Sequence, residues 1–166
     1  MTFKPSVMAL ALLAVMPLSH AATLQLTWGD PDKFRDIRAG DDNQIKYQER
    51  VIKDLEAAFK TAAAKLPADQ TLKIEIKDLD LAGEVEFFHP GFPFGIRVVR
   101  NIDFPRMELS FELRDGKSQV LKSGDPVISD MGFRDGIQLP NNSTPLRYET
   151  KMIKQWFERE FPGSRT

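Results

Sequence analysis

Five aspartates lie within residues 28–42, and such a density of carboxylates could bind a metal ion or supply an acid catalyst. A calcium loop of the EF-hand type needs oxygen ligands at its first, third and fifth positions, glycine at the sixth and glutamate at the twelfth. Counted from Asp30, the last three of these positions hold Phe34, Arg35 and Asp41, so the pattern fails at each of them. Basic residues between the aspartates also neutralise them. We therefore interpret the stretch as an ion-paired loop that leads into a helix, and we predict no metal site.

A second group of acids could support hydrolysis by two carboxylates. Asp78 and Asp80 are two residues apart on a predicted strand, where alternate side chains share a face. Glycoside hydrolysis needs one carboxyl group in an apolar setting and one in a polar setting, and the sequence shows no such difference. Asp36, Asp78 and Asp80 therefore form a candidate acid cluster, which is the weaker hypothesis. A structural ion pair is the favoured role of Asp78, with three candidate partners: Arg97, Arg100 and Arg106.

Other catalytic groups are scarce. The chain has no cysteine, which excludes thiol nucleophiles, zinc–thiolate sites, iron–sulfur clusters and disulfides. Of its two histidines, His20 belongs to the leader described below, so His89 is the single imidazole expected in the mature chain. A Ser-His-Asp triad would have to use His89, which lies in a loop rich in proline and glycine. We predict no catalytic residues of these kinds and no cofactor.

The segment from Glu84 to Gly95 combines phenylalanines with proline and glycine, which argues against a regular helix or strand. Its aromatic residues and the arginines that follow are the best candidates for a ligand-binding surface: Phe87, Phe88, Phe92, Phe94, Arg97 and Arg100. If exposed, they would suit an envelope protein, a peptide, a glycan or a membrane surface. The favoured alternative is that the loop folds back over the sheet edge and buries the rings, because so apolar a loop would otherwise promote aggregation.

The first 21 residues have the layout of a secretory signal peptide. An apolar run extends from Val7 to Leu18, and the small residues Ser19 and Ala21 occupy positions −3 and −1 of a cleavage site. The run is about a dozen residues long, whereas a membrane-spanning helix needs roughly 20. We therefore expect residues 1–21 to be removed and residues 22–166 to form one exported domain without a transmembrane segment. Export of a chain without cysteine favours the bacterial periplasm.

Alternation of apolar and polar residues predicts strands. The segments that show it are residues 24–28, 72–76 and 107–113, and we also predict short strands at residues 96–102 and 120–122. The alternation slips by one residue at Asp78, because Leu79 and Leu81 are out of phase with Ile76, which predicts either a β-bulge or the end of the strand. Asp115-Gly116 predicts a hairpin with a two-residue type I′ turn between the last two strands.

Apolar residues at helical spacing predict two amphipathic helices. The first begins at Asp41, which pairs with Gln44 in a capping box, and ends before Pro67. Its expected buried residues are Ile45, Ile52, Leu55, Phe59, Ala62 and Leu66. The second begins at Thr144-Pro145. Its expected buried stripe is Leu146, Ile153, Phe157 and Phe161, with Met152 and Trp156 at its sides.

Elements in this order predict an α+β fold, with a mostly antiparallel sheet of about four to five strands and two amphipathic helices on one face. The first strand–helix–strand unit can form a right-handed crossover, which would make its two strands parallel. No internal repeat or low-complexity tract divides the chain, so we expect one domain.

Three stretches of the chain resemble a known family. They are "WGDPDKFRDIRAG", "YETKMIKQWFEREF", and the segment from "LKIEIKDLDLAGEVE" through "IRVVRNIDFPRMELSFELRDGKSQVLKSGD" to "DMGF". In order and spacing they resemble the exported bacterial family catalogued as domain of unknown function 3016, over about residues 23–161. The resemblance implies export and a single domain, and it assigns no activity, substrate or catalytic residue. The loop from Phe87 to Phe94 is the segment least expected to be shared with the family.

Two functions therefore stay open. The first is a periplasmic, non-enzymatic binding or envelope-assembly module, whose partner would be an envelope protein, a peptide or a glycan. The second is a hydrolase of the cell envelope that uses carboxylates alone. The formal net charge of −1 for the whole chain is near zero, whereas nucleic-acid binders usually carry a basic face, so we expect no nucleic-acid partner.

Overall fold

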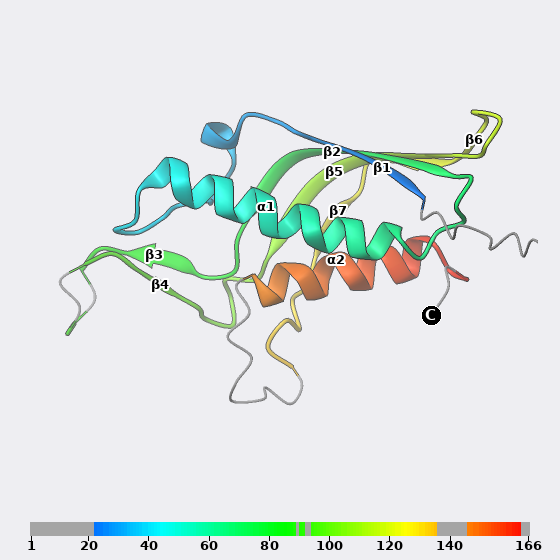
Figure 1. The fold of residues 1–166 in the computed structure, drawn as a ribbon. Coiled ribbons are helices and arrows are strands. Elements are labelled where there is room, and N and C mark those ends of the chain that lie inside the picture. The colour runs from blue at the N-terminus through cyan, green and yellow to red at the C-terminus, as the bar shows by residue number, and fades with distance from the viewer. Residues whose placement is uncertain (1–21, 89, 92–93, 136–145, 164–166) are drawn as a thin grey trace, which may run out of the picture.

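A mixed sheet covered by two helices forms the body of the protein (Figure 1). The computed structural model describes residues 22–88, 90–91, 94–135 and 146–163. Its elements are β1 (Thr23–Trp28), the 3-10 turn η1 (Pro31–Lys33), α1 (Gln44–Ala63), β2 (Thr71–Asp80), β3 (Glu84–Glu86), β4 (Ile96–Val98), β5 (Arg106–Arg114), β6 (Val120–Gly124), β7 (Val127–Ser129) and α2 (Arg147–Glu160). The larger sheet has the order β1-β2-β5-β6, and β7 also pairs with β5.

The predicted α+β class is confirmed, and the sheet is mixed. β1 lies parallel to β2, as the crossover through α1 allows, whereas β5 is antiparallel to β2, β6 and β7. Strand β7 was not predicted, because its three residues are too few to show alternation. Among the described residues, no helix is long and apolar enough to cross a membrane.

The hydrophobic core lies between the helices and one face of the sheet (Figure 1). Its least exposed side chains are Leu55, Phe59, Leu72, Ile76, Leu79, Leu81, Met107, Leu109, Met152, Ile153 and Phe157. Trp156, predicted at the side of its helical stripe, is also buried. Ile45 was predicted to be buried and is instead 67% exposed, because the first turn of α1 extends beyond the edge of the larger sheet (Figure 1).

The phase slip in β2 is a β-bulge. The pairing of β2 with β5 shifts register between Ile76 and Asp78, and the strand then continues to Asp80. The extra residue returns Leu79 to the core face, where it is fully buried. Asp78 and Asp80 therefore stay on a paired strand at the edge of the core.

The start of α1 differs from the prediction. Asn43 caps the helix, and its side-chain oxygen accepts from the Lys46 N–H at 3.0 Å. The predicted capping box between Asp41 and Gln44 is wrong, because the Gln44 amide turns back to the preceding loop, where it accepts from the Ala39 N–H and donates to the Ile37 carbonyl. The predicted start of α2 at Thr144-Pro145 lies outside the described residues, and the helix is described from Arg147.

A second, two-stranded sheet projects from the end of the body (Figure 1). In it, β3 pairs with β4 in an antiparallel hairpin, so the predicted irregular segment 84–95 is wrong at its start, and the predicted strand 96–102 ends at Val98. Gly83 lets the chain turn from β2 into β3. It has a φ of +84°, and a Cβ atom there would lie 2.7 Å from the Val98 carbonyl oxygen.

The predicted hairpin between β5 and β6 is confirmed, although its turn is longer than expected. The Asp115 N–H donates to the Gln119 carbonyl, and the Asp115 carboxylate accepts from the Lys117 and Gln119 N–H groups. The positive φ falls on Ser118, at +65°, rather than on two central residues of a type I′ turn. The aspartate side chain therefore organises the loop.

Candidate functional site

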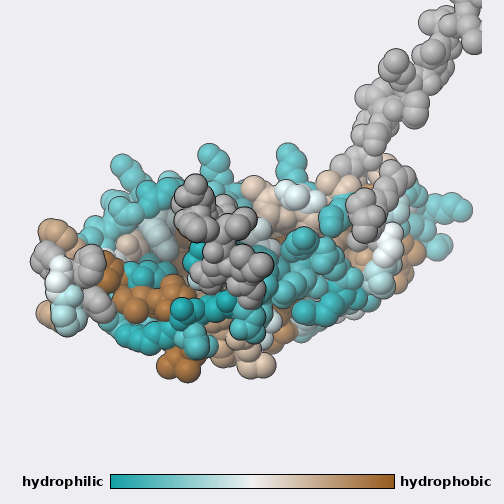
Figure 2. Space-filling view, turned by 90° about the horizontal axis from the view of Figure 1, so that it is seen from below, coloured by the Kyte–Doolittle hydropathy of each residue, from teal (hydrophilic) through white to brown (hydrophobic). Residues whose placement is uncertain are grey.

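The β3–β4 hairpin presents phenylalanines to solvent at one end of the molecule. The exposed fractions are 51% for Phe87, 99% for Phe88 and 65% for Phe94, and we call these three residues the aromatic tip. The expectation that the loop buries its rings is wrong for them, because β3 and β4 pair with each other and carry the loop away from the larger sheet. Phe92 lies outside the described residues. Figure 2 shows hydrophobic atoms at the end of the molecule that the hairpin forms.

The hairpin is held against the body next to the aromatic tip. The Gly95 N–H donates to Asp41 Oδ1 at 2.9 Å. Gly40 has a φ of +65°, and a Cβ atom there would lie 2.5 Å from the Gly95 carbonyl oxygen, so only glycine permits this approach. The Phe87 ring lies against Gly95 on the hairpin itself. Asp41 therefore joins the loop before α1 to the hairpin, which orients the tip.

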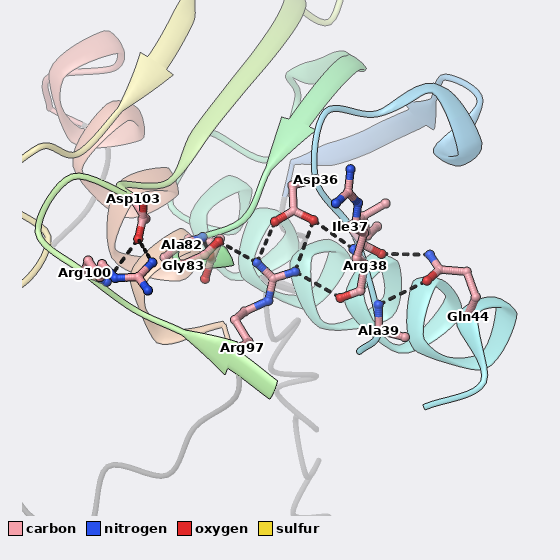
Figure 3. Close-up of polar contacts among 11 residues, drawn as sticks. Asp36, Ile37, Arg38, Ala39, Gln44, Ala82, Gly83, Arg97, Arg100 and Asp103 are labelled. Carbon is pink, nitrogen blue, oxygen red and sulfur yellow. Dashed lines mark hydrogen bonds and ion pairs between the residues drawn. The ribbon is translucent and has the colours of Figure 1, made fainter. Parts of the chain in front are cut away.

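Arg97 on β4 links the hairpin to the body through four contacts (Figure 3). Its Nη1 lies 2.8 Å from Asp36 Oδ2 and its Nη2 lies 3.3 Å from Asp36 Oδ1. The same two nitrogens donate to the carbonyl oxygens of Gly83, at 2.7 Å, and Arg38, at 3.0 Å. Both charged side chains are largely buried, with 18% of Arg97 and 14% of Asp36 exposed. Arg97 was a candidate for ligand binding, and the structure instead shows its guanidinium occupied by these internal partners.

Arg100 has a similar structural role in a more exposed position. Its guanidinium forms an ion pair with Glu86 on the neighbouring strand and another with Asp103, with Nη1 and Oδ2 3.7 Å apart. The Arg100 backbone N–H also donates to the Asp103 carboxylate. Arg100 therefore joins β3 to the turn after β4, and it does not form part of the aromatic tip.

The three aspartates of the candidate acid cluster meet at the end of β2. Asp36 forms an isolated parallel β-bridge with Asp80. Asp78 accepts from the Arg35 N–H at 2.8 Å, and its carboxylate lies 3.7 Å from Arg106 Nη1, so the predicted ion pair with one of three arginines is confirmed for Arg106. The Oδ2 atom of Asp80 lies 4.0 Å from Nη1 of Arg35. The convergence follows from the bulge and from the loop that returns beside β2.

A cavity of about 350 Å³ adjoins this cluster, and its lining combines carboxylates, Asp36 and Asp80 among them, with three arginines. Burial raises the pKa of the Asp80 carboxyl, the nearby Arg35 opposes this shift, and the negative charges of Asp36 and Asp78 reinforce it. An elevated pKa beside a second carboxylate is one property that acid–base catalysis requires. Asp36 is, however, held in the ion pair with Arg97, which leaves it in a structural role.

Sequence reasoning did not identify Glu149 of α2, whose side chain is buried, with 2% exposed. Its Oε1 accepts from the Ala82 N–H at 2.7 Å, just before the turn into β3. Burial raises the pKa of Glu149 because it disfavours the charged carboxylate, while the Ala82 hydrogen bond opposes the shift. One signal was present in the sequence. Glu149 lies three residues after Leu146 and four before Ile153, so it occupies a position of the buried helical stripe.

Replacing Glu149 with glutamine should change how stability depends on pH. Because the pKa of Glu149 is raised above its usual value of 4.5, the folded state keeps a proton that the unfolded chain loses first. Wild-type stability should therefore decrease as the pH rises from about 4.5 through the higher pKa of the folded protein, and this contribution should be constant above it. Glutamine keeps an oxygen acceptor for Ala82 and does not ionise, so the Glu149→Gln variant should lack the decrease.

Urea unfolding of the wild type and the Glu149→Gln variant across this pH range measures the difference. The free-energy advantage of the variant should grow with pH. A Glu149→Ala control removes the acceptor as well and should lose about 1–3 kcal/mol even at low pH, where the wild-type carboxyl is neutral. Parallel wild-type and Glu149→Gln curves would contradict the assignment of a raised pKa.

The described residues contain no cluster of three or more histidine, aspartate or glutamate side chains that could hold a metal ion. The acidic residues at the end of β2 are instead interleaved with arginines, and Arg35 and Arg106 contact them directly. The arrangement at this end of the molecule is therefore an ion-paired network beside an exposed aromatic tip.

Together, the fold and this site define a small α+β protein in which two helices cover a mixed sheet and an anchored hairpin displays aromatic residues. The chain belongs to the family described as Protein of unknown function (DUF3016), whose family model matches residues 22–159. The resemblance noted from the sequence motifs is thereby confirmed. Comparisons with curated proteins and with solved structures found no match.

Proposed function

We propose that the mature protein is a non-enzymatic binding module of the bacterial periplasm, which uses the aromatic tip to hold a component of the cell envelope. The observation that carries the proposal is the exposure of Phe88, at 99%, on a hairpin that is anchored beside it. The leader-like residues 1–21 support export, and cell fractionation with intact-mass measurement tests both the periplasmic location and cleavage after Ala21.

The energetics favour a binding role for the tip. Burying one phenylalanine side chain is worth about 1.5–3 kcal/mol, so three exposed rings offer a substantial gain to any partner that covers them. Aromatic side chains are also common among the few residues that dominate interface affinity. The tip is already oriented by Asp41 and Arg97, so little ordering is required when a partner binds.

Replacing Phe87, Phe88 and Phe94 with serine should abolish most binding to washed envelope fractions. The expected loss is at least tenfold in the retained fraction, because each substitution removes apolar area that a partner would cover. Co-sedimentation of the purified chain, produced from residue 22 onward, with envelope fragments measures the retained fraction.

A matched control distinguishes the tip from apolar exposure in general. Val120 and Leu121 on β6 are 49% and 51% exposed, and they belong to a different hairpin. The Val120→Ser, Leu121→Ser variant should bind as the wild type does. Equal binding by the wild type and the triple serine variant would overturn the proposed function.

A carboxylate-only hydrolase is the second candidate, and the raised pKa of Asp80 next to Asp36 favours it. In that case the chain should release soluble fragments from envelope glycans, and Asp80→Asn should abolish the release. An Asp125→Asn control, in which an exposed aspartate paired with Lys77 is changed, should retain it. Absence of release by the wild type would remove this candidate.

A further inference from the structure

The aromatic tip belongs to a hairpin that projects from the end of the body (Figure 1). Phe87 lies against Gly95 on the hairpin and keeps about half of its surface exposed, whereas Phe88 is 99% exposed and so makes almost no contact with the rest of the protein. Phe94 is on the returning side of the loop and is 65% exposed. Exposed aromatic side chains are therefore present on both the outgoing and the returning side of a loop at the far end of the β3–β4 hairpin.

The start of α1 extends this apolar end. The bond between Asp41 and Gly95 holds the loop before α1 beside the hairpin, and Ile45 in the first helical turn is 67% exposed. In the described part of the chain, nine large hydrophobic side chains are exposed, and four of them are Ile45 and the three phenylalanines of the tip. Exposed apolar side chains are thus concentrated at this end of the protein.

Charges near this end are largely balanced. Arg97 pairs with Asp36, Arg100 with Glu86, and an exposed arginine of α1, Arg50, pairs with Asp42. These ion pairs leave little net electrostatic potential that could attract a strongly acidic or basic partner. The recognition available here is apolar burial.

We propose that the aromatic tip inserts into the boundary between headgroups and acyl chains of a phospholipid bilayer, so that the envelope component held by the module is a lipid surface. This inference rests on the proposed function and specifies its partner. A bilayer can surround a projecting loop from every side, whereas a folded protein would need a deep pocket to cover exposed rings on both the outgoing and the returning side of that loop. With so few side chains inserted, binding is weak and reversible, with an association constant on the order of 10⁴ M⁻¹, similar to that of a single acyl anchor.

Protein-free vesicles test the proposal directly. The chain produced from residue 22 onward, without the apolar leader, should co-sediment with vesicles of phosphatidylethanolamine and phosphatidylcholine. Phe88→Ser alone should weaken this partitioning about tenfold, because it removes the most exposed ring. The Val120→Ser, Leu121→Ser control should partition as the wild type does. Added salt or added phosphatidylglycerol should change the wild-type value little, since the nearby charges are paired.

A spectroscopic variant reports which surface enters the lipid. In a Phe88→Trp variant, the new indole should shift its emission to shorter wavelength on vesicle binding and should be quenched by brominated acyl chains. The native tryptophans provide an internal control, because Trp156 is buried in the core and Trp28 lies at the end of β1 with its Nε1–H bonded to Glu56 on α1. Their emission in the wild-type protein should not be quenched.

The outcomes separate the two proposals. If the chain binds washed envelope through the tip but not protein-free vesicles, and protease treatment of the envelope removes the binding, the partner is a protein and the lipid inference is wrong. If vesicles bind the chain while the Phe88→Trp emission is unchanged, another surface contacts lipid and the inference is also wrong. If the triple serine variant still binds envelope as the wild type does, the proposed function itself fails.

Discussion

Replacing Arg97 with methionine is expected to lower the free energy of unfolding by about 3–5 kcal/mol, because the largely buried Asp36 carboxylate would lose its partner. The carbonyl oxygens of Gly83 and Arg38 would lose donors as well. Methionine retains much of the aliphatic volume, so the loss reports on the charged contacts. Equilibrium unfolding in urea measures it, and amide hydrogen exchange should show that β3 and β4 lose protection first.

Arg100→Met is the matched control for this prediction. Arg100 pairs with Glu86 and Asp103, but 45% of its side chain is exposed, so its ion pairs are screened by water and worth about 1 kcal/mol or less. A double Asp36→Leu, Arg97→Met variant should recover part of the stability, because no unpaired charge then stays buried. If Arg97→Met and Arg100→Met lose similar amounts, Arg97 is not the link between hairpin and body.

The strands of the larger sheet could be predicted because one of their faces is buried. In β5, and in β2 as far as the bulge, every second residue is apolar, and a shift of one residue would expose the whole apolar set, so the pattern is strict. Because the alternation is strict, the bulge at Asp78 could be recognised in the sequence as a shift of the apolar positions by one residue. The helices were found for a related reason, since each has a continuous apolar stripe that must face the sheet.

The hairpin β3–β4 could not be predicted from local pattern, because each strand has only three residues and pairs with the other outside the larger sheet. Its position depends on contacts between residues far apart in the chain, such as the bond from Gly95 to Asp41. The helix cap was missed for a similar reason. Asn43 and Asp41 are both good capping residues. The Asp41 carboxylate accepts from the Gly95 N–H of the hairpin, and Asn43 caps the helix.

The candidate site was predictable as a set of residue types and not as an arrangement. The residues of the acid cluster could be named from the sequence. Two backbone hydrogen bonds place Asp36 beside β2: its N–H donates to the Leu79 carbonyl, and its carbonyl accepts from the Leu81 N–H. Both bonds span more than forty positions in the chain, so no local pattern reveals them. The favoured prediction that the loop buries its rings was wrong for the aromatic tip, since burial depends on what lies next to the loop. Glu149 was overlooked because a charged residue in an apolar stripe is usually exposed.

Trp156 lies at the centre of the aromatic core between the helices and the sheet. The sequence predicts it at the side of its helical stripe, yet the residue is 2% exposed and its ring has four aromatic neighbours at centroid distances between 5.6 and 6.3 Å. These neighbours are Phe59, Phe111, Phe157 and Phe161. They come from α1, β5, α2 and the residue after α2, so this ring joins both helices to the sheet.

Replacing Trp156 with alanine is therefore expected to lower the free energy of unfolding by about 3–5 kcal/mol, through lost burial and a cavity between rings that cannot fully close. Urea unfolding followed by far-ultraviolet circular dichroism measures the loss without relying on the removed chromophore. Because the four neighbours belong to separate elements, we expect the transition to stay cooperative at a lower midpoint.

Trp156→Phe should behave quite differently. The buried Nε1–H of Trp156 has no hydrogen-bond partner among the residues that the structure describes, so phenylalanine removes a polar group that is costly to bury while keeping most of the ring contacts. These two effects oppose each other, and the net loss should stay below about 1.5 kcal/mol. A loss for Trp156→Phe as large as that for Trp156→Ala would show that the indole nitrogen has a partner in solution, and that packing alone does not explain why tryptophan occupies this position.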